Sequence, residues 1–307
     1  MLKRKTSLLL AAAVLFSAPA AAQTAAPAPA ATAAALPDAD PAIWVVKDPD
    51  TTIYLFGTFH ALDGKTDWFN EEVKTAFDKS NEVVLEIPPV EDKASMQPII
   101  MKYAIDTTGK PLSEKLSPEG KERLAKALAG LGAPPTAFDT FKPFFAALTV
   151  VMAGAQKLGF TGEQGAEAVL TKAAKDAKKP ISGLETIDYQ MSLFANMSDA
   201  DQVKMLEETL KEVEELGPMF AEMNKHWTTG DADGMAKLMN EMNAQSPSMY
   251  KTLLTDRNAN WADWIAKRLE KPGTVFMGVG AGHLGGGDSV QALLAKRGIQ
   301  SARVAAE

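Results

Sequence analysis

The stretch TTIYLFGTFH, residues 51–60, has a counterpart near the end of the chain in TVFMGVGAGH, residues 274–283. Both runs are rich in the apolar and β-branched residues that favour strands, and both close on the pattern G-x-x-H. This pattern places His60 and His283 just beyond the ends of two predicted strands. Side chains at the carboxyl ends of strands with crossover helices project into a common crevice, so the two imidazoles are predicted to face each other.

A third predicted strand brings a carboxylate to the same crevice. NEVVLEI, residues 81–87, carries Glu86 near its end, where an ionised carboxylate is costly to bury unless it is paired or coordinated. Imidazole is the commonest protein ligand for metals and the usual general base near neutral pH. His60, Glu86 and His283 are therefore predicted to be both catalytic residues and ligands of an open metal site. The alternative for Glu86 is an ordinary strand-end carboxylate in a salt bridge or at the surface.

The glycine-rich loop GVGAGHLGGG, residues 278–287, has two other interpretations. Residues 280–285 match G-x-G-x-x-G between a predicted strand and a predicted helix, as in a dinucleotide fingerprint. That fingerprint belongs to a first β-α-β unit, and too few residues follow the loop here to complete a nucleotide-binding sheet. The third interpretation is a tight turn in which His283 only packs or caps.

The rest of the chain predicts an α/β fold with α+β character. A hairpin partner, residues 42–48, precedes the first G-x-x-H strand, a last strand follows at 299–305, and residues 179–185 are a candidate extra strand. Helical periodicity occupies much of the remainder, at residues 113–131, 138–158, 165–178, 199–224, 231–243, 248–269 and 288–298. We therefore expect a small central sheet formed by N- and C-terminal segments, with a large, mostly helical insertion or cap at about 92–271.

The first residues predict export. Residues 1–22 combine three cations, a short apolar run and a small-residue end, which is typical of a secretory signal peptide. Residues 23–41 are almost entirely Ala, Pro and Thr and predict a disordered linker, so the folded domain is expected at 42–307. No cysteine is present, which excludes disulfides and thiolate chemistry. Removing the three signal-peptide cations changes the formal net charge from -7 to -10, which argues against nucleic-acid binding.

Together these blocks resemble the TraB/GumN family, which is related to the Tiki proteins and more distantly to erythromycin-esterase-like and ChaN-like proteins. The resemblance covers about residues 42–304 and is carried by YLFGTFH (54–60), VVLEI (83–87), GLETIDYQ (183–190), LLTDRNANW (253–261) and VGAGHLGGGDSVQALLAKRGI (279–299). Tiki proteins are understood as metal-dependent proteases that use Mn or Co. The resemblance implies that His60, Glu86 and His283 hold such an ion, with Zn or Fe as other candidates.

Two further sets of residues are candidates for secondary roles. Glu185, Arg257 and Asn258 match family blocks, and they are predicted to orient ligands or bind a substrate carboxylate, with ordinary capping and ion pairing as the alternative. His226 lies in a methionine-rich stretch that predicts either a flexible core seam, a Cu(I) site or a peptide-binding face.

The functional expectation is an exported, periplasmic or secreted metal-dependent hydrolase that resembles a metallopeptidase. Its expected partner is a peptide or protein substrate, with no nucleic acid and no membrane span once the signal peptide is removed. The alternative is a non-catalytic envelope protein that sequesters a peptide or glycan in the same crevice. A metal-free mechanism, with histidine and glutamate as acid and base, is a third arrangement that the erythromycin-esterase relatives suggest.

Overall fold

A single mixed sheet organises the protein. The structure is a computed structural model that describes residues 35–90 and 92–306; the predicted signal peptide and residues 23–34 of the predicted linker lie outside this range. Along the sheet the strands are ordered β4-β3-β5-β2-β1-β6. Their bounds are β1 Ile43–Lys47, β2 Thr51–Thr58, β3 Glu82–Leu85, β4 Ile181–Gly183, β5 Gly273–Gly280 and β6 Ser301–Arg303.

The register of the central strands brings three chain segments to one edge. β2 and β3 both pair with β5 in parallel, and Thr58 lies directly opposite Gly280 while Leu85 lies opposite Gly278. The residues that follow β2, β3 and β5 therefore leave the sheet side by side. The hairpin partner β1 is antiparallel to both β2 and β6, and β4 extends the parallel part beyond β3.

Helices cover both faces of this sheet because its central strands are apolar on both sides. Phe56, Val83 and Phe276 belong to one core cluster, and Leu55, Val84 and Met277 belong to another. The first cluster includes side chains of α1 (Glu71–Lys79), α6 (Ala166–Asp176) and α9 (Leu216–Thr228). The second is formed with α12 (Asp256–Arg268) and α13 (Val290–Lys296). The sheet is thus the middle layer of three.

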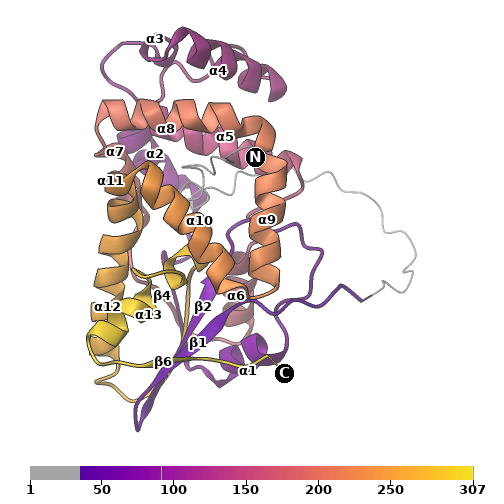
Figure 1. Ribbon diagram of the computed structural model, residues 1–307, viewed down its shortest axis with the longest axis vertical. Coiled ribbons are helices and arrows are strands. Elements are labelled where there is room, and N and C mark those ends of the chain that lie inside the picture. The colour runs from indigo at the N-terminus through magenta and orange to yellow at the C-terminus, as the bar shows by residue number, and fades with distance from the viewer. Residues whose placement is uncertain (1–34, 91, 307) are drawn as a thin grey trace.

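A helical cap with its own core stands beyond the sheet layers (Figure 1). Its apolar core contains Leu112, Leu128, Phe144 and Leu206. The helices that contribute to it are α2 Met96–Ala104, α3 Leu112–Lys115, α4 Pro118–Gly130, α5 Pro143–Lys157, α7 Ile187–Ala195, α8 Asp199–Glu212 and α11 Pro247–Tyr250. Helix α10 (Ala232–Gln245) runs between α9 and α11.

The predicted fold class is confirmed, and so is the extra strand, which is β4. The predicted range of the cap needs correction, because residues 92–271 also contain α6, β4 and α12, which belong to the sheet layers. The helix predicted at 199–224 is broken by a 3-10 turn at Val213–Glu215. The cause is Pro218, which has no N–H to donate to the carbonyl of the preceding turn. Helices α1, α2 and α7 were not predicted.

The predicted linker is wrong at its end. Within residues 37–41, Ala39 is buried and its N–H donates to the Asp67 carbonyl, while the Asp40 N–H donates to the Thr228 carbonyl. These backbone bonds attach the segment to the domain despite its Ala- and Pro-rich composition.

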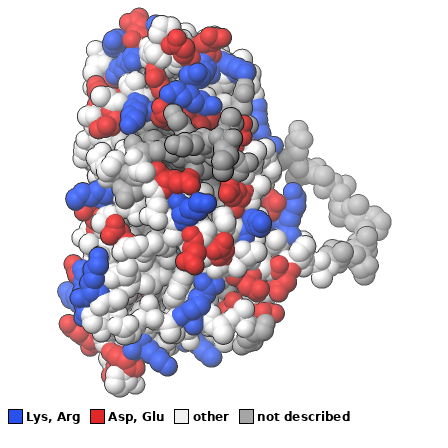
Figure 2. Space-filling view, viewed as in Figure 1, with Lys and Arg blue, Asp and Glu red and all other residues white. Residues whose placement is uncertain are grey.

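Of the helices in the described part of the chain, none has the length and apolar character needed to cross a membrane. Basic and acidic side chains intermingle on the face that Figure 2 shows.

Candidate functional site

His60 leaves the end of β2 and is held by a carboxylate from the helix packed against it. The Ala166 N–H at the start of α6 donates to the Phe59 carbonyl at 3.0 Å, which places Glu167 beside the loop. His60 Nδ1 lies 2.5 Å from Glu167 Oε1. Burial alone would lower the pKa of His60, but Glu167, with help from Glu86, outweighs it and raises the pKa to about 9. His60 is therefore an imidazolium at neutral pH, with Nε2 turned away from Glu167.

Glu86, directly after β3, is a buried carboxylate with a complete set of donors. Its Oε1 accepts the Gly280 N–H at 2.7 Å, and its Oε2 accepts Arg257 Nη2 at 2.6 Å and Gln190 Nε2 at 3.1 Å. Burial alone would raise the pKa of Glu86, but the Arg257 guanidinium outweighs it and keeps the pKa well below its usual range. Glu86 is therefore ionised throughout the neutral range.

His283 lies in the 3-10 turn Ala281–Leu284 that follows β5, and it is buried as a neutral ring. Its Nδ1 is 2.5 Å from Asn258 Oδ1, and its Nε2 is 3.1 Å from Arg257 Nη1. Because Asn258 Nδ2 donates to the Asp288 carbonyl, Asn258 Oδ1 is the acceptor and His283 carries its proton on Nδ1. Burial, together with the nearby Arg257, lowers the pKa of His283 to about 3.

Arg257 connects these groups from the first turn of α12. A π-helical segment, Lys251–Thr255, immediately precedes the helix, and Arg257 Nη1 donates to the Leu253 carbonyl within it at 3.0 Å. Arg257 Nε donates to Glu185, and Nη2 pairs with both Glu86 and Glu185. With the bond to His283, every nitrogen of this 3% exposed residue has a protein acceptor. The guanidinium therefore orients the other groups and presents no free nitrogen to a substrate.

Glu185 completes the charged network from the end of β4. The Glu185 N–H donates to the Glu86 carbonyl at 2.8 Å, so the ladder of β3 and β4 sets the two carboxylates side by side. The Glu185 carboxylate also accepts Trp261 Nε1 at 2.9 Å and Gln190 Nε2 at 2.9 Å. Trp261 in turn packs its ring 4.4 Å from the His283 ring, between centroids.

Gly280 lies among the three predicted residues and has no side chain to press on them. A Cβ on Gly280 would lie 3.1 Å from Glu86 Oε1, 3.3 Å from His60 Nε2 and 3.5 Å from His283 Cδ2. The structure thus brings His60, Glu86 and His283 to one place, as predicted. Glu185, Arg257 and Asn258 stand behind them as orienting groups, and their contact with a substrate stays a prediction.

Three members of the site were missed in the sequence. Glu167, Gln190 and Trp261 make contacts with residues far away in the chain, and helical periodicity does not distinguish such side chains from ordinary surface or core positions. The available indication for Gln190 and Trp261 was their place in the family blocks at 183–190 and 253–261. Glu167 had no such indication.

As arranged, these residues do not fit a three-ligand metal ion, although their donor chemistry suits one. His283 Nδ1 is hydrogen-bonded to Asn258 Oδ1, His60 Nδ1 is ion-paired with Glu167, and both Nε2 atoms are directed inward, which is the usual orientation of metal-binding histidines. However, Arg257 occupies His283 Nε2 and Glu86 Oε2. Among the described residues, the set of His, Asp and Glu ligand atoms within 4.8 Å of one another is Asp38, Asp40 and Glu71, and it excludes the predicted trio. The predicted ion stays a prediction.

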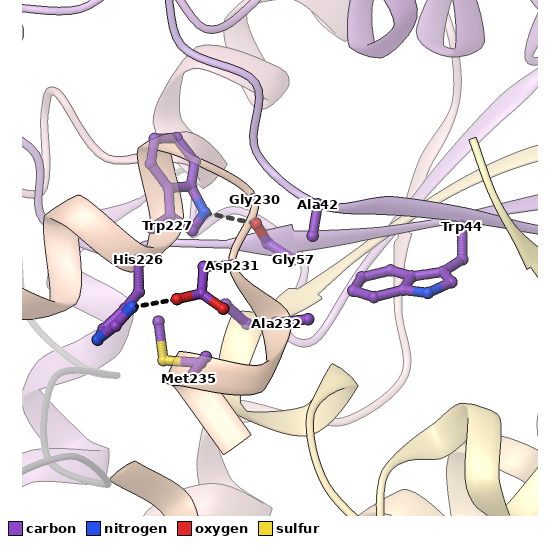
Figure 3. Close-up of a pocket in the computed structure, with 10 residues that line it drawn as sticks. Ala42, Trp44, Gly57, His226, Trp227, Gly230, Asp231, Ala232 and Met235 are labelled. Carbon is purple, nitrogen blue, oxygen red and sulfur yellow. Dashed lines mark hydrogen bonds and ion pairs between the residues drawn. The ribbon is translucent and has the colours of Figure 1, made fainter. Parts of the chain in front are cut away.

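His226 lines a second pocket, which is partly open to solvent (Figure 3). His226 Nδ1 is 2.7 Å from Asp231 Oδ2, and Trp227 Nε1 donates to the Gly57 carbonyl at 2.7 Å. Met235 also lines this pocket and is buried in the core, in accord with the core-seam prediction. Side chains of Met239 and Met242, the other methionines at helical spacing in this segment, lie outside the described part of the structure.

Comparisons with known proteins point to one family. The model of the TraB/PrgY/gumN family matches residues 42–303. "Uncharacterized protein YbaP" of Escherichia coli strain K12 is 28% identical over 183 residues, which covers 60% of this chain and 67% of that protein. The protein of the same name from Shigella flexneri matches equally. No solved structure matches the chain significantly.

Proposed function

The chain belongs to the TraB/PrgY/gumN family, and from that premise we propose that it is an exported hydrolase that cleaves peptide bonds in the crevice around Gly280. Export is supported by the sequence of residues 1–22, which has the three regions of a signal peptide. The named relatives are uncharacterized, so the proposal rests on the geometry of the site and on the family resemblance.

One observation carries the proposal: His60 Nε2 and Glu86 Oε1 converge on Gly280, 3.3 Å and 3.1 Å from the point where a Cβ on that residue would lie. The His60 side chain is 20% exposed, whereas those of Glu86 and His283 are 6% exposed. His60 is therefore the member of the trio that solvent and substrate reach most easily. Its Nδ1 is ion-paired with Glu167, which lies where the carboxylate of a catalytic triad lies beside its histidine.

The proposed chemistry is general acid–base hydrolysis at His60. Neutral His60 Nε2 takes a proton from a water, the water oxygen adds to the carbonyl carbon of the substrate, and the resulting imidazolium returns the proton to the departing amine. Because the pKa of His60 is about 9, the neutral form becomes abundant only as the pH rises toward that value. The expected rate therefore increases from pH 7 to about 9.

The metal-dependent form of the proposal, with Mn, Co, Zn or Fe on His60, Glu86 and His283, requires Arg257 to release His283 Nε2 and Glu86 Oε2. For that reason the chemistry above is assigned to side chains alone.

The competing function is a non-catalytic envelope protein that sequesters a peptide or glycan. It is favoured by the complete internal pairing of Arg257 and Glu185, which leaves His60 as the main reactive group.

Cleavage of a defined mixture of synthetic peptides, followed by mass spectrometry, tests the proposal. Mature wild-type protein should release products, and His60→Ala should reduce the rate by at least about 10²-fold, as expected for loss of a general base. Treatment with EDTA should leave the wild-type rate unchanged. Activity that disappears with EDTA and returns with Mn or Co would support the metal-dependent form. Absence of any cleavage, with peptide binding retained, would support the sequestering protein instead.

A further inference from the structure

We propose that the guanidinium of Arg257 is the resident cation of this site and that it keeps divalent metal ions off Glu86 and His283. The inference concerns cation binding and does not depend on the proposed hydrolysis, because it is tested without any substrate. Arg257 would then stand where the family resemblance implies a metal ion.

Arg257 already occupies the lone pairs that an ion would need. Its Nη1 is 3.1 Å from His283 Nε2, and its Nη2 is 2.6 Å from Glu86 Oε2. The side chain is 4% exposed and is further fixed by Glu185 and the Leu253 carbonyl. An ion that binds His283 and Glu86 would have to break both contacts and move the guanidinium within a closed network.

The surroundings of Arg257 are built to retain its positive charge. The carboxylates of Glu86 and Glu185 both pair with Nη2, and the Trp261 ring lies 4.7 Å from the guanidinium carbon. The guanidinium of an arginine keeps its positive charge in proteins. The group thus remains a cation, and like charges at such short range exclude a second cation from the same ligands.

His283 is oriented toward this guanidinium in the way that a metal-binding histidine is oriented toward its ion. Asn258 Oδ1 accepts the proton on Nδ1, and Asn258 is itself fixed by the Asp288 carbonyl, so the lone pair of Nε2 points at Arg257. The same second partner on Nδ1 accompanies histidine ligands of metals. Removal of the guanidinium should therefore convert an arginine site into a metal site.

The test compares metal binding by the mature wild type with that of a variant in which the cation is removed. Arg257→Met alone leaves Glu86 and Glu185 without a counter-charge, so it is combined with Glu185→Gln, which keeps Glu86 as the one carboxylate. Co²⁺ and Zn²⁺ are added separately, and stoichiometry is measured by isothermal titration calorimetry and by elemental analysis after gel filtration. Arg257→Lys with Glu185→Gln is the matched control that retains a positive charge.

Wild type and the lysine control should retain no stoichiometric ion, whereas the Arg257→Met, Glu185→Gln variant should bind about one equivalent at least tenfold more tightly than wild type. Adding His283→Ala to this variant should abolish the gain, which locates the ion and separates it from adventitious binding at the exposed Asp38, Asp40 and Glu71 cluster. The melting temperature of the methionine variant should rise on addition of Zn²⁺, and that of wild type should not.

Two outcomes would overturn the inference. The first is a wild type that holds about one equivalent of Co²⁺ or Zn²⁺ and loses it with His283→Ala. The second is a folded methionine variant that binds no better than wild type. If the methionine variant does not fold, the titrations of wild type and of His283→Ala test the inference by themselves, because an ion bound by wild type and lost with His283→Ala would overturn it. Failure of the hydrolase proposal would appear as absent peptide cleavage and leaves these titrations unaffected.

Discussion

At the scale of single residues, the contact between His60 and Glu167 has the largest chemical consequence. The same imidazole without a carboxylate would titrate below its ordinary pKa because burial disfavours the charged ring. Glu167 reverses the direction of that shift and raises the pKa to about 9. His283, which faces Arg257 in place of a carboxylate, shifts the opposite way, to about 3. One site thus holds a charged and a neutral histidine at the same pH.

Replacement of Glu167 by Gln tests this assignment directly. We expect the pKa of His60 to fall from about 9 to near or below its ordinary value of 6.5. Burial lowers this pKa, and without the Glu167 carboxylate only Glu86 remains to raise it. The measurement is a pH titration of the ring carbons by NMR with ¹³C-labelled histidine, which has three signals to assign in this chain. Glu163→Gln, an exposed position shortly before α6, is the control and should leave the titration unchanged. A His60 signal that still titrates near pH 9 without Glu167 would contradict the assignment.

At the scale of secondary-structure elements, the end of β5 determines how closely the histidine loops approach each other. Thr58 and Gly280 are paired across β2 and β5, and the backbone of Gly280 has φ -50° and ψ 134°, which an alanine adopts without strain. The glycine is therefore required for space alone. A methyl group there would press on the carboxylate of Glu86 and on Nε2 of His60.

Gly280→Ala should reduce hydrolysis by about 10²-fold, since displacements of about 1 Å at a reacting centre have effects of that size. The fold should survive, so we expect a cooperative thermal transition close to that of wild type. Gly287→Ala is the matched control from the same loop, because a Cβ there meets nothing within 4 Å. Peptide cleavage rates and melting curves for both variants provide the check. Equal activity of the two variants would show that the space beside Gly280 is not used.

At the scale of the whole molecule, the buried charges make folding stability depend on pH in a definite way. His60 has a raised pKa, so its contribution is complete below 6.5 and is lost as the pH rises through about 9. His283 has a lowered pKa, so stability is lost as the pH falls from 6.5 toward 3 and the unfolded chain takes up the proton. Glu86 and Glu167, with lowered pKa values, add to the loss below about pH 4.5. The combined contribution of these four groups to the free energy of unfolding should therefore be greatest near pH 6.5.

Urea unfolding at pH 4, 5, 6.5, 8 and 9.5 measures this profile. Wild type should lose stability as the pH rises from 6.5 to 9.5, and His60→Gln should remove most of this decline while leaving the loss at acid pH in place. His226→Gln is the control, because that histidine lies in the second pocket and should not change the alkaline decline. Wild-type stability that stays constant or rises from pH 6.5 to 9 would refute the charge state assigned to His60.

The sequence by itself determined the strands and the positions of their terminal histidines. The apolar runs at 51–58 and 274–280 are buried on both faces, and such runs predict central parallel strands whatever the rest of the chain does. Because residues after the carboxyl ends of parallel strands emerge at one edge, His60, Glu86 and His283 could be grouped without a structure. The break before α9 was also readable from Pro218 in the first turn of that helix, although it was missed.

Only the tertiary structure decided what surrounds those three residues and hence their charge. Arg257 is 171 residues from Glu86 in the chain, and Glu167 reaches His60 because α6 packs against the end of β2. Local propensity and periodicity carry no information about such pairings, since they depend on how helices from distant segments dock on the sheet. The packing of α6 on the sheet brings Glu167 to His60, whose charged form it stabilises. The packing of α12 brings the Arg257 guanidinium to the position expected for a metal ion.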